Sequence, residues 1–137
     1  MRHMIRGTTA QFRFKLPCKK SELGWATIKF WQPGNTGIGG SLPITRRLEH
    51  CSGSSDAEEL CVSLLPEETM RFSDKSKARV QLRACKGEND ADGTVFASHV
   101  QLITVYPINE EILEDDDITD VETEGDYIIL DGQPIIT

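Results

Sequence analysis

The sequence lacks long hydrophobic runs, and this argues against a membrane-spanning helix. No stretch approaches the ~18 consecutive apolar residues that such a helix requires, and none resembles a signal peptide. Aromatic residues are also few, at 7% of the 137 residues, but hydrophobic residues reach 38%, which suffices for one core. Because domains typically contain about 100–150 residues, we expect a single globular domain. The lack of long apolar runs means that no membrane partner is expected.

Cysteine is scarce, and its spacing does not favour a metal site. Cys18, Cys51, Cys61 and Cys85 form no C-x-x-C pair, so neither a zinc ribbon nor a thioredoxin-type site is predicted. The histidines are scattered as well. Nothing in the sequence indicates an oxidising compartment, and free thiols are therefore the expectation.

Motifs that mark common enzymes and cofactor sites are missing too. The sequence has no G-x-x-x-x-G-K-[ST] loop, no H-E-x-x-H pair and no G-x-S-x-G elbow. The glycine-rich run Gly37–Gly40 lacks the strand-to-helix setting of a phosphate site, so a flexible loop is predicted. Asn89–Gly93 is similar to the start of a calcium loop, but the closing glutamate is missing and a hairpin turn is expected. We predict no catalytic residues, no metal ligands and no cofactors.

Basic residues are absent after Lys86, which divides the chain electrostatically. Residues 1–109 carry a net charge of +4 and residues 110–137 carry −11, with 11 of the 22 acidic residues between Glu110 and Asp131. Such a tail is typically solvated and repels nucleic acid, so no nucleic-acid partner is expected. Two interpretations stay open: a solvated spacer, or a segment that engages a basic surface on this body or on a neighbouring subunit.

Alternation of apolar and polar residues predicts an all-β domain. Runs with a period of two residues, which is the pattern of half-buried strands, are separated by turn-forming residues. They cover residues 8–16, 25–32, 42–51, 60–64, 78–85 and 94–106. Residues 66–72 begin with a proline followed by acids, which suits a single helical turn. Strands at this spacing favour a small antiparallel β-sandwich.

The pattern also assigns two individual residues to a face of their predicted strand. Arg46 lies on the apolar face of its predicted strand, 42–51, and weakens that prediction. In the predicted long strand 94–106, the alternation places Leu102 on the same face as Phe96 and opposite Ile103.

The tail ends in two short apolar runs. Residues 127–130 and 134–136 flank Asp131–Gly132–Gln133, and Asp-Gly between apolar runs predicts a β-hairpin. An isolated hairpin is only marginally stable, so it needs a sheet to lie on, either in this chain or in a neighbouring subunit. The expected organisation is an N-terminal extension over 1–7, a sandwich over 8–108, an acidic arm over 109–126 and a hairpin or anchoring strands over 127–137.

Aromatic and apolar residues are the candidates for partner contacts. Trp25 and Trp31 fall on the outward face of their predicted strand, where exposed tryptophans are typical of a contact surface. Packing under the glycine loop is the alternative. Basic residues share this outward pattern, Lys29 among them, and a nucleic-acid platform could use the mixture, but the acidic overall charge favours a polar sheet face. The candidate partner-binding residues are Trp25, Trp31, Tyr127, Ile128, Ile129, Leu130, Ile135 and Ile136.

Several motifs also carry a resemblance to a known group of proteins. Ile5–Ala10 followed by Phe12–Pro17 resembles the opening of small structural proteins encoded by tailed phages and prophages of gut bacteria. The similarity continues in the same order through Leu64–Phe72, Val80–Arg83 and Ala97–Ser98, and covers about residues 4–106. The layout is also similar to the immunoglobulin-like N-terminal domains of phage baseplate proteins. The loops 33–41 and 51–56 and the acidic tail depart from this pattern.

This resemblance implies an immunoglobulin-like antiparallel β-sandwich with one short helical turn and an acidic C-terminal arm. It implies a non-enzymatic virion protein that is assembled in the cytoplasm of a bacterial host. The expected partners are other virion proteins and copies of the chain itself, bound through sheet surfaces and the C-terminal arm. The alternative is a module that binds carbohydrate or another host-surface component, with tryptophans stacking on sugar rings.

Overall fold

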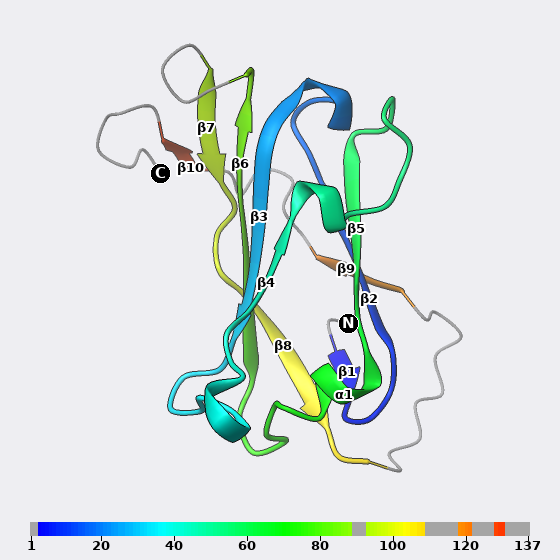
Figure 1. Ribbon diagram of the computed structural model, residues 1–137, viewed down its shortest axis with the longest axis vertical. Helices are drawn as coiled ribbons and strands as arrows, with labels where there is room; N and C mark the ends of the chain where they lie inside the picture. Colours follow the sequence, from blue (N-terminus) through cyan, green and yellow to red (C-terminus); the bar gives the residue numbers. More distant parts are fainter. Residues whose placement is uncertain (1–2, 89–92, 109–117, 122–127, 131–137) are drawn as a thin grey trace.

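The computed structural model describes residues 3–88, 93–108, 118–121 and 128–130, which form two β-sheets that face each other (Figure 1). The apolar side chains lie between the sheets. The prediction of an all-β sandwich with one short helical turn is thereby confirmed.

The smaller sheet has the strand order β5-β2-β9. Its central strand β2 (Ala10–Lys15) pairs antiparallel with β5 (Glu59–Leu64) and parallel with β9 (Ile118–Val121). Successive side chains of a strand point to opposite sides. Phe12 and Phe14 of β2 therefore both face the core, where they are fully buried.

The larger sheet contains seven strands, with the main order β1-β8-β6-β3-β4. β1 pairs parallel with β8, and the other neighbours are antiparallel. β7 also pairs with β6, beside β8, and β10 pairs antiparallel with β7. The strands are β1 (His3–Ile5), β3 (Leu23–Trp31), β4 (Ile44–Arg47), β6 (Ala78–Lys86), β7 (Thr94–Ala97), β8 (Gln101–Tyr106) and β10 (Ile128–Leu130).

The chain crosses repeatedly from one sheet of the sandwich to the other. β2 lies in the smaller sheet, β3 and β4 in the larger, β5 again in the smaller, and β6 to β8 return to the larger. The short helix α1 (Pro66–Thr69) lies in the crossing from β5 to β6, and its first residue is a proline, as predicted.

The core is built by the inward positions of β2 and β5 on one side and of β3, β6 and β8 on the other. Phe12 and Phe30 meet across the sheets, with their ring centroids 5.0 Å apart. Fully burying one such side chain stabilises the fold by about 1.5–3 kcal/mol. The largest fully buried side chains are Phe12, Phe14, Phe30, Phe72, Met4, Ile28, Leu60, Leu64, Leu82, Ile103, Val80 and Thr69.

The predicted strand 94–106 is wrong in one respect, because it is two strands. Ser98, which is fully buried, interrupts it: the Ser98 amide donates to the Leu82 carbonyl at 2.9 Å, and the Leu82 amide donates to the Ser98 hydroxyl at 3.0 Å. The irregular residues between β7 and β8 shift the alternation by one position, and such a slip exchanges the two faces of a strand. Ile103 therefore faces the core, and Leu102 is 43% exposed.

The predicted strand 42–51 is also shorter than expected. The observed strand β4 ends at Arg47, and the chain continues as the 3₁₀ helix η3 (Leu48–His50). At this turn the Arg47 amide donates to Nδ1 of His50 at 3.0 Å. The other short 3₁₀ helices are η1 (Lys20–Glu22) and η2 (Ile38–Gly40).

A buried amide fixes the base of the glycine-rich loop that we predicted to be flexible. Gln32, the residue after β3, donates from Nε2 to the carbonyls of Ser73 at 2.7 Å and Ser76 at 2.8 Å. Its Oε1 accepts a hydrogen bond from Nδ2 of Asn35 at 2.7 Å. These bonds tie the loop to the segment after α1.

Both ends of the described chain contribute to the sheets. Residues 1–7 were expected to be an extension, but β1 forms an edge of the larger sheet and Met4 is buried. The acidic arm 109–126 was not expected to contain a strand, yet β9 pairs with β2. Ile128, Ile129 and Leu130 form β10, which pairs with β7 of the same chain.

Candidate contact surface

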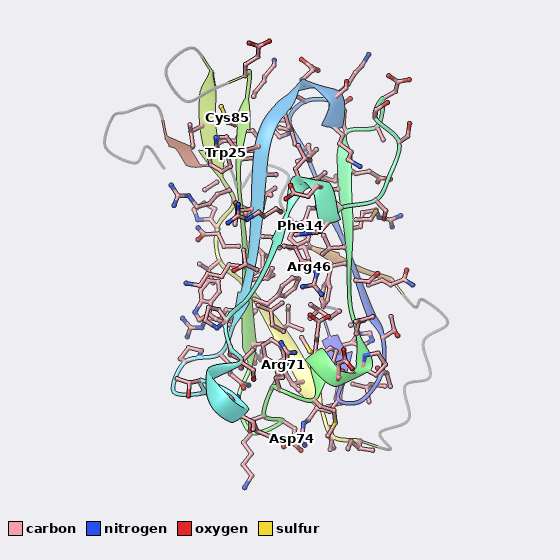
Figure 2. The ribbon with its side chains drawn as sticks, in the orientation of Figure 1. Phe14, Trp25, Arg46, Arg71, Asp74 and Cys85 are labelled. Carbon is pink, nitrogen blue, oxygen red and sulfur yellow. The ribbon has the colours of Figure 1, made fainter. Side chains whose placement is uncertain are left out.

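The outward side of the larger sheet gathers basic and aromatic residues. β3 contributes Trp25, Thr27, Lys29 and Trp31, all of which lie opposite the buried positions of that strand. Figure 2 shows Trp25 and Cys85 on this outer side, whereas Phe14 lies between the sheets. We call the outward side of β3, β4 and β6 the basic face; its charged and aromatic residues are Trp25, Lys29, Trp31, Arg47, Arg79 and Arg83.

Strand register sets the arrangement of these residues. Thr27 of β3 lies between Arg47 of β4 and Arg83 of β6, so one row across the sheet holds two arginines. Arg79 lies opposite Trp31 in another row. The Nζ of Lys29 is 5.3 Å from the centroid of the Trp31 ring, and this cation–π contact places the ammonium group over the indole ring.

The charge of the basic face is of one sign. Among the outward positions of β3, β4 and β6 there are four cations and no carboxylate. Within the described part of the chain, neither Arg79 nor Arg83 forms an ion pair; the pairs found there join Arg46 to Glu68 and Lys86 to Glu22. Like charges on neighbouring strands repel one another, so the face carries a cost in folding.

The two tryptophans do not form the aromatic pair that a stacking platform would need. Both are half-buried, and six residues of extended strand separate Trp25 from Trp31 by about 20 Å. They mark opposite ends of the basic face, and each can contribute to a contact independently.

An open pocket of about 640 Å³ lies beside Trp25, where β3 meets the end of β4 and η3. Its lining combines an indole ring with the arginine Arg47 and the carboxylate Glu49. The sequence did not point to Arg47 or Glu49, because the predicted strand 42–51 gave no sign of the turn at η3. The only available signal was the Arg-Arg dipeptide, which places one arginine on each side of an alternating strand.

The outer side of the smaller sheet is different, because opposite charges are in register there. Lys15 lies opposite Glu59, and Arg13 opposite Asp120 of β9. Opposite charges directly across two strands stabilise the pairing. The register thus places Asp120 of β9 beside Arg13 of β2, whereas no carboxylate lies among the outward positions of β3, β4 and β6 in the described part of the chain.

The first arginine of the dipeptide, Arg46, has a structural role. Arg46 lies between the sheets (Figure 2), where its Nη2 donates to Oε1 of Glu68 and, at 3.3 Å, to the carbonyl of Ser63. Burial raises the pKa of Glu68, but hydrogen bonds from Arg46 and from the Leu65 amide, together with nearby positive charge, lower it more, so the pKa lies below its ordinary value. The ion pair with Glu68 compensates the charge of Arg46 and so explains why an arginine occupies an inward position of the strand.

Two of the four cysteines are poor nucleophiles near neutral pH. All four are free, in agreement with the expectation of free thiols. Burial raises the pKa of Cys51 to about 11 and also raises that of Cys18, so both are protonated near neutral pH. In the described residues, no group of three His, Cys, Asp or Glu side chains is placed to hold a metal ion.

Two of the predicted contact residues and part of the tail can be placed. Trp25 and Trp31 lie on the basic face, and Ile128, Ile129 and Leu130 lie in β10. Tyr127, Ile135 and Ile136, and with them the predicted hairpin turn, lie outside the described residues.

The fold class is therefore an all-β sandwich with a basic, aromatic sheet face. Within the residues described, no helix has the length and apolar character that crossing a membrane requires. Comparisons with family models, with curated proteins and with solved structures found no match.

Proposed function

We propose that this chain is a non-enzymatic structural protein of a bacteriophage particle, and that it binds neighbouring subunits through the basic face and through its C-terminal arm. The observation that carries the proposal is the set of four cations on one sheet face, flanked by two half-buried tryptophans, with no carboxylate among them. Arginine and tryptophan are enriched at the energetic centres of protein interfaces.

The phage origin in this proposal is supported by the sequence resemblance over residues 4–106, and the fold gives its motifs a common role. The hydroxyl of Thr69, in the motif 64–72, donates to the Thr8 carbonyl at 2.8 Å and accepts from the Gly7 amide at 3.0 Å. Arg6 donates to the Met70 carbonyl at 3.3 Å. The two separated motifs therefore form one joint between the N-terminal segment and α1.

The chemistry of the basic face favours binding over catalysis. Guanidinium groups stay protonated at neutral pH and donate hydrogen bonds in a fixed plane, so they bind carboxylates but do not transfer protons. The indole rings of Trp25 and Trp31 offer flat apolar area together with one donor each. Such a face recognises an extended acidic partner with apolar side chains.

Particle incorporation tests the proposal. In a bacterial host that produces the particles, the variant Arg79→Ala/Arg83→Ala is compared with Lys75→Ala/Lys77→Ala, which removes the same charge from exposed residues outside the strands of the basic face. We expect the unchanged chain and the control in purified particles, and at least a tenfold lower content of the face variant. Absence of the unchanged chain from the particles, or equal incorporation of both variants, would contradict the proposal.

A second candidate function, carbohydrate binding, is favoured by the pocket beside Trp25. An aromatic ring next to Arg47 and Glu49 provides a stacking surface and polar groups for hydroxyls. If this function is correct, titration with host-surface polysaccharide saturates, and Trp25→Ala abolishes binding while Trp31→Ala, about 20 Å away, leaves it intact.

A further inference from the structure

We infer that the basic face binds the acidic segment 110–117 of a second copy of this chain. The inference rests on the proposed function, because it names the partner of the surface that we assign to subunit contacts. Three observations carry it: the spacing of the cations, the composition of the acidic segment, and the positions at which the ends of that segment are held.

The cations are spaced to match an extended acidic chain. Arg79 and Arg83 are four residues apart on β6, or about 13 Å, with Gln81 midway between them. Lys29 lies directly opposite Gln81 on β3. In an extended segment, side chains that share a side are about 7 Å apart, so two alternate carboxylates fall at the spacing of two neighbouring rows of cations, such as the rows of Lys29 and Arg83.

The sequence contains such a segment. Six of the eight residues from 110 to 117 are acidic, and the other two, Ile112 and Leu113, are apolar. Fully extended, eight residues reach about 27 Å, which exceeds the ~20 Å between the two tryptophans of the basic face. Two alternate carboxylates, Glu114 and Asp116, can therefore meet Lys29 and Arg83 while Ile112 meets the indole ring of Trp31.

One end of this segment is held on the smaller sheet and the other lies beside the N-terminal segment that leads into that sheet, which favours a second copy over the same chain. Ile108 lies beside Gly7, and Ile118 pairs with Gln11 on β2. The basic face is on the outer side of the other sheet. Packed sheets are about 10 Å apart, and nine residues reach about 30 Å. A path around the sandwich and back would use most of that length, leaving little chain to lie along the face.

The mass of the full-length chain in solution tests this inference. We expect sedimentation equilibrium to show self-association at about 50 mM salt that weakens at least tenfold at about 500 mM, because screening removes charge attraction. A chain that stays monomeric at low salt, or an association that does not depend on salt, would overturn it.

Charge-reversed variants identify the two surfaces. The face variant carries Lys29→Glu, Arg79→Glu and Arg83→Glu, and the tail variant carries Asp115→Lys, Asp116→Lys and Asp117→Lys. The matched control, Lys19→Glu/Lys75→Glu/Lys77→Glu, reverses three exposed lysines off the basic face. We expect the face and tail variants each to lose self-association at least tenfold, the control to keep it, and a mixture of face and tail variants to associate. Circular dichroism confirms that each variant is folded.

Specific outcomes separate this inference from the proposed function. A face variant that self-associates normally, or a mixture that fails to associate after both variants lose association, overturns the inference. Binding of DNA or an acidic polysaccharide by the face, with no self-association, also overturns it and assigns another occupant. If the chain stays monomeric but Arg79→Ala/Arg83→Ala is still excluded from particles, the proposed function stands and only the second-copy partner is wrong.

Discussion

Replacing Arg83 by threonine is expected to stabilise the isolated chain, because Arg83 lies within about 13 Å of all three other cations of the basic face. Arg83 lies about 10 Å from Arg47 across two strand spacings, about 8 Å from Lys29 on the diagonal, and about 13 Å from Arg79 along β6. Threonine removes the charge and is a β-branched residue that suits an exposed strand position.

The magnitude follows from Coulomb's law. Unit charges at these separations in water repel by about 0.3–0.5 kcal/mol each, so the removal of Arg83 relieves about 1 kcal/mol at low ionic strength. At about 500 mM salt the screening length is only a few Å, and most of this gain disappears. A gain on losing a charge is the expected relation between stability and function when a surface is kept for binding.

Urea unfolding at about 20 mM and about 500 mM salt measures this effect. We expect Arg83→Thr to raise the free energy of unfolding by about 1 kcal/mol at low salt and by nearly nothing at high salt. Lys75→Thr, an exposed position off the basic face, serves as the control and should show no comparable gain. A loss of stability in Arg83→Thr at low salt, or a gain that salt does not change, would refute the reasoning and indicate that the Arg83 stem packs as part of the fold.

Four further predictions concern buried groups. Gln32→Leu should lower the free energy of unfolding by about 3 kcal/mol in urea, since it leaves buried backbone groups without partners; a loss under about 1 kcal/mol would count against this account. Glu68 has a pKa below its ordinary 4.5, so its contribution is complete above that pH and is lost as the pH falls through the lower, folded-state pKa. Unfolding of the unchanged chain should therefore depend on pH more steeply below pH 4.5 than that of Glu68→Gln, and parallel curves would contradict the role of Arg46. Thr69→Val should cost about 1–2 kcal/mol and Thr69→Ser much less, because serine keeps the hydroxyl; equal losses would show that packing decides. Alkylation of Cys51 should be slow at neutral pH and accelerate toward pH 11, and fast reaction at neutral pH would show that its thiol is not shielded.

The central strands were predictable because local alternation and tertiary burial agree. The runs 8–16, 25–32, 60–64 and 78–85 correspond to β2, β3, β5 and β6, with ends displaced by two residues or fewer. In each strand, the same side that is apolar in sequence faces the core. Two strands of each sheet are thereby set by pattern alone.

The errors occur where long-range contacts decide. Ser98 interrupts a continuous alternation because its side chain and backbone bind Leu82 of another strand, which no local pattern reveals. β9 lies in a run of acids, and its pairing depends on the basic strand β2, more than 100 residues earlier in the sequence.

The candidate surface was predictable in part. The outward position of Trp25 and Trp31 follows from the parity of their strand, and their separation follows from the spacing of residues. The row formed by Arg47 and Arg83 was not predictable, because it depends on the register between β4, β3 and β6. The pocket beside Trp25 depends in addition on the turn at η3.

The most direct test of the basic face is zero-length carbodiimide cross-linking of purified particles, followed by mass spectrometry. This reagent joins a lysine amine to a carboxylate in contact with it, and Lys29 is the lysine on the basic face. Our account predicts that Lys29 is joined to an acidic residue of a neighbouring subunit, while the exposed Lys75 is not. Particles that contain the chain but show Lys29 unreacted, or no more cross-linked than Lys75, would contradict the assignment of this face to subunit contacts.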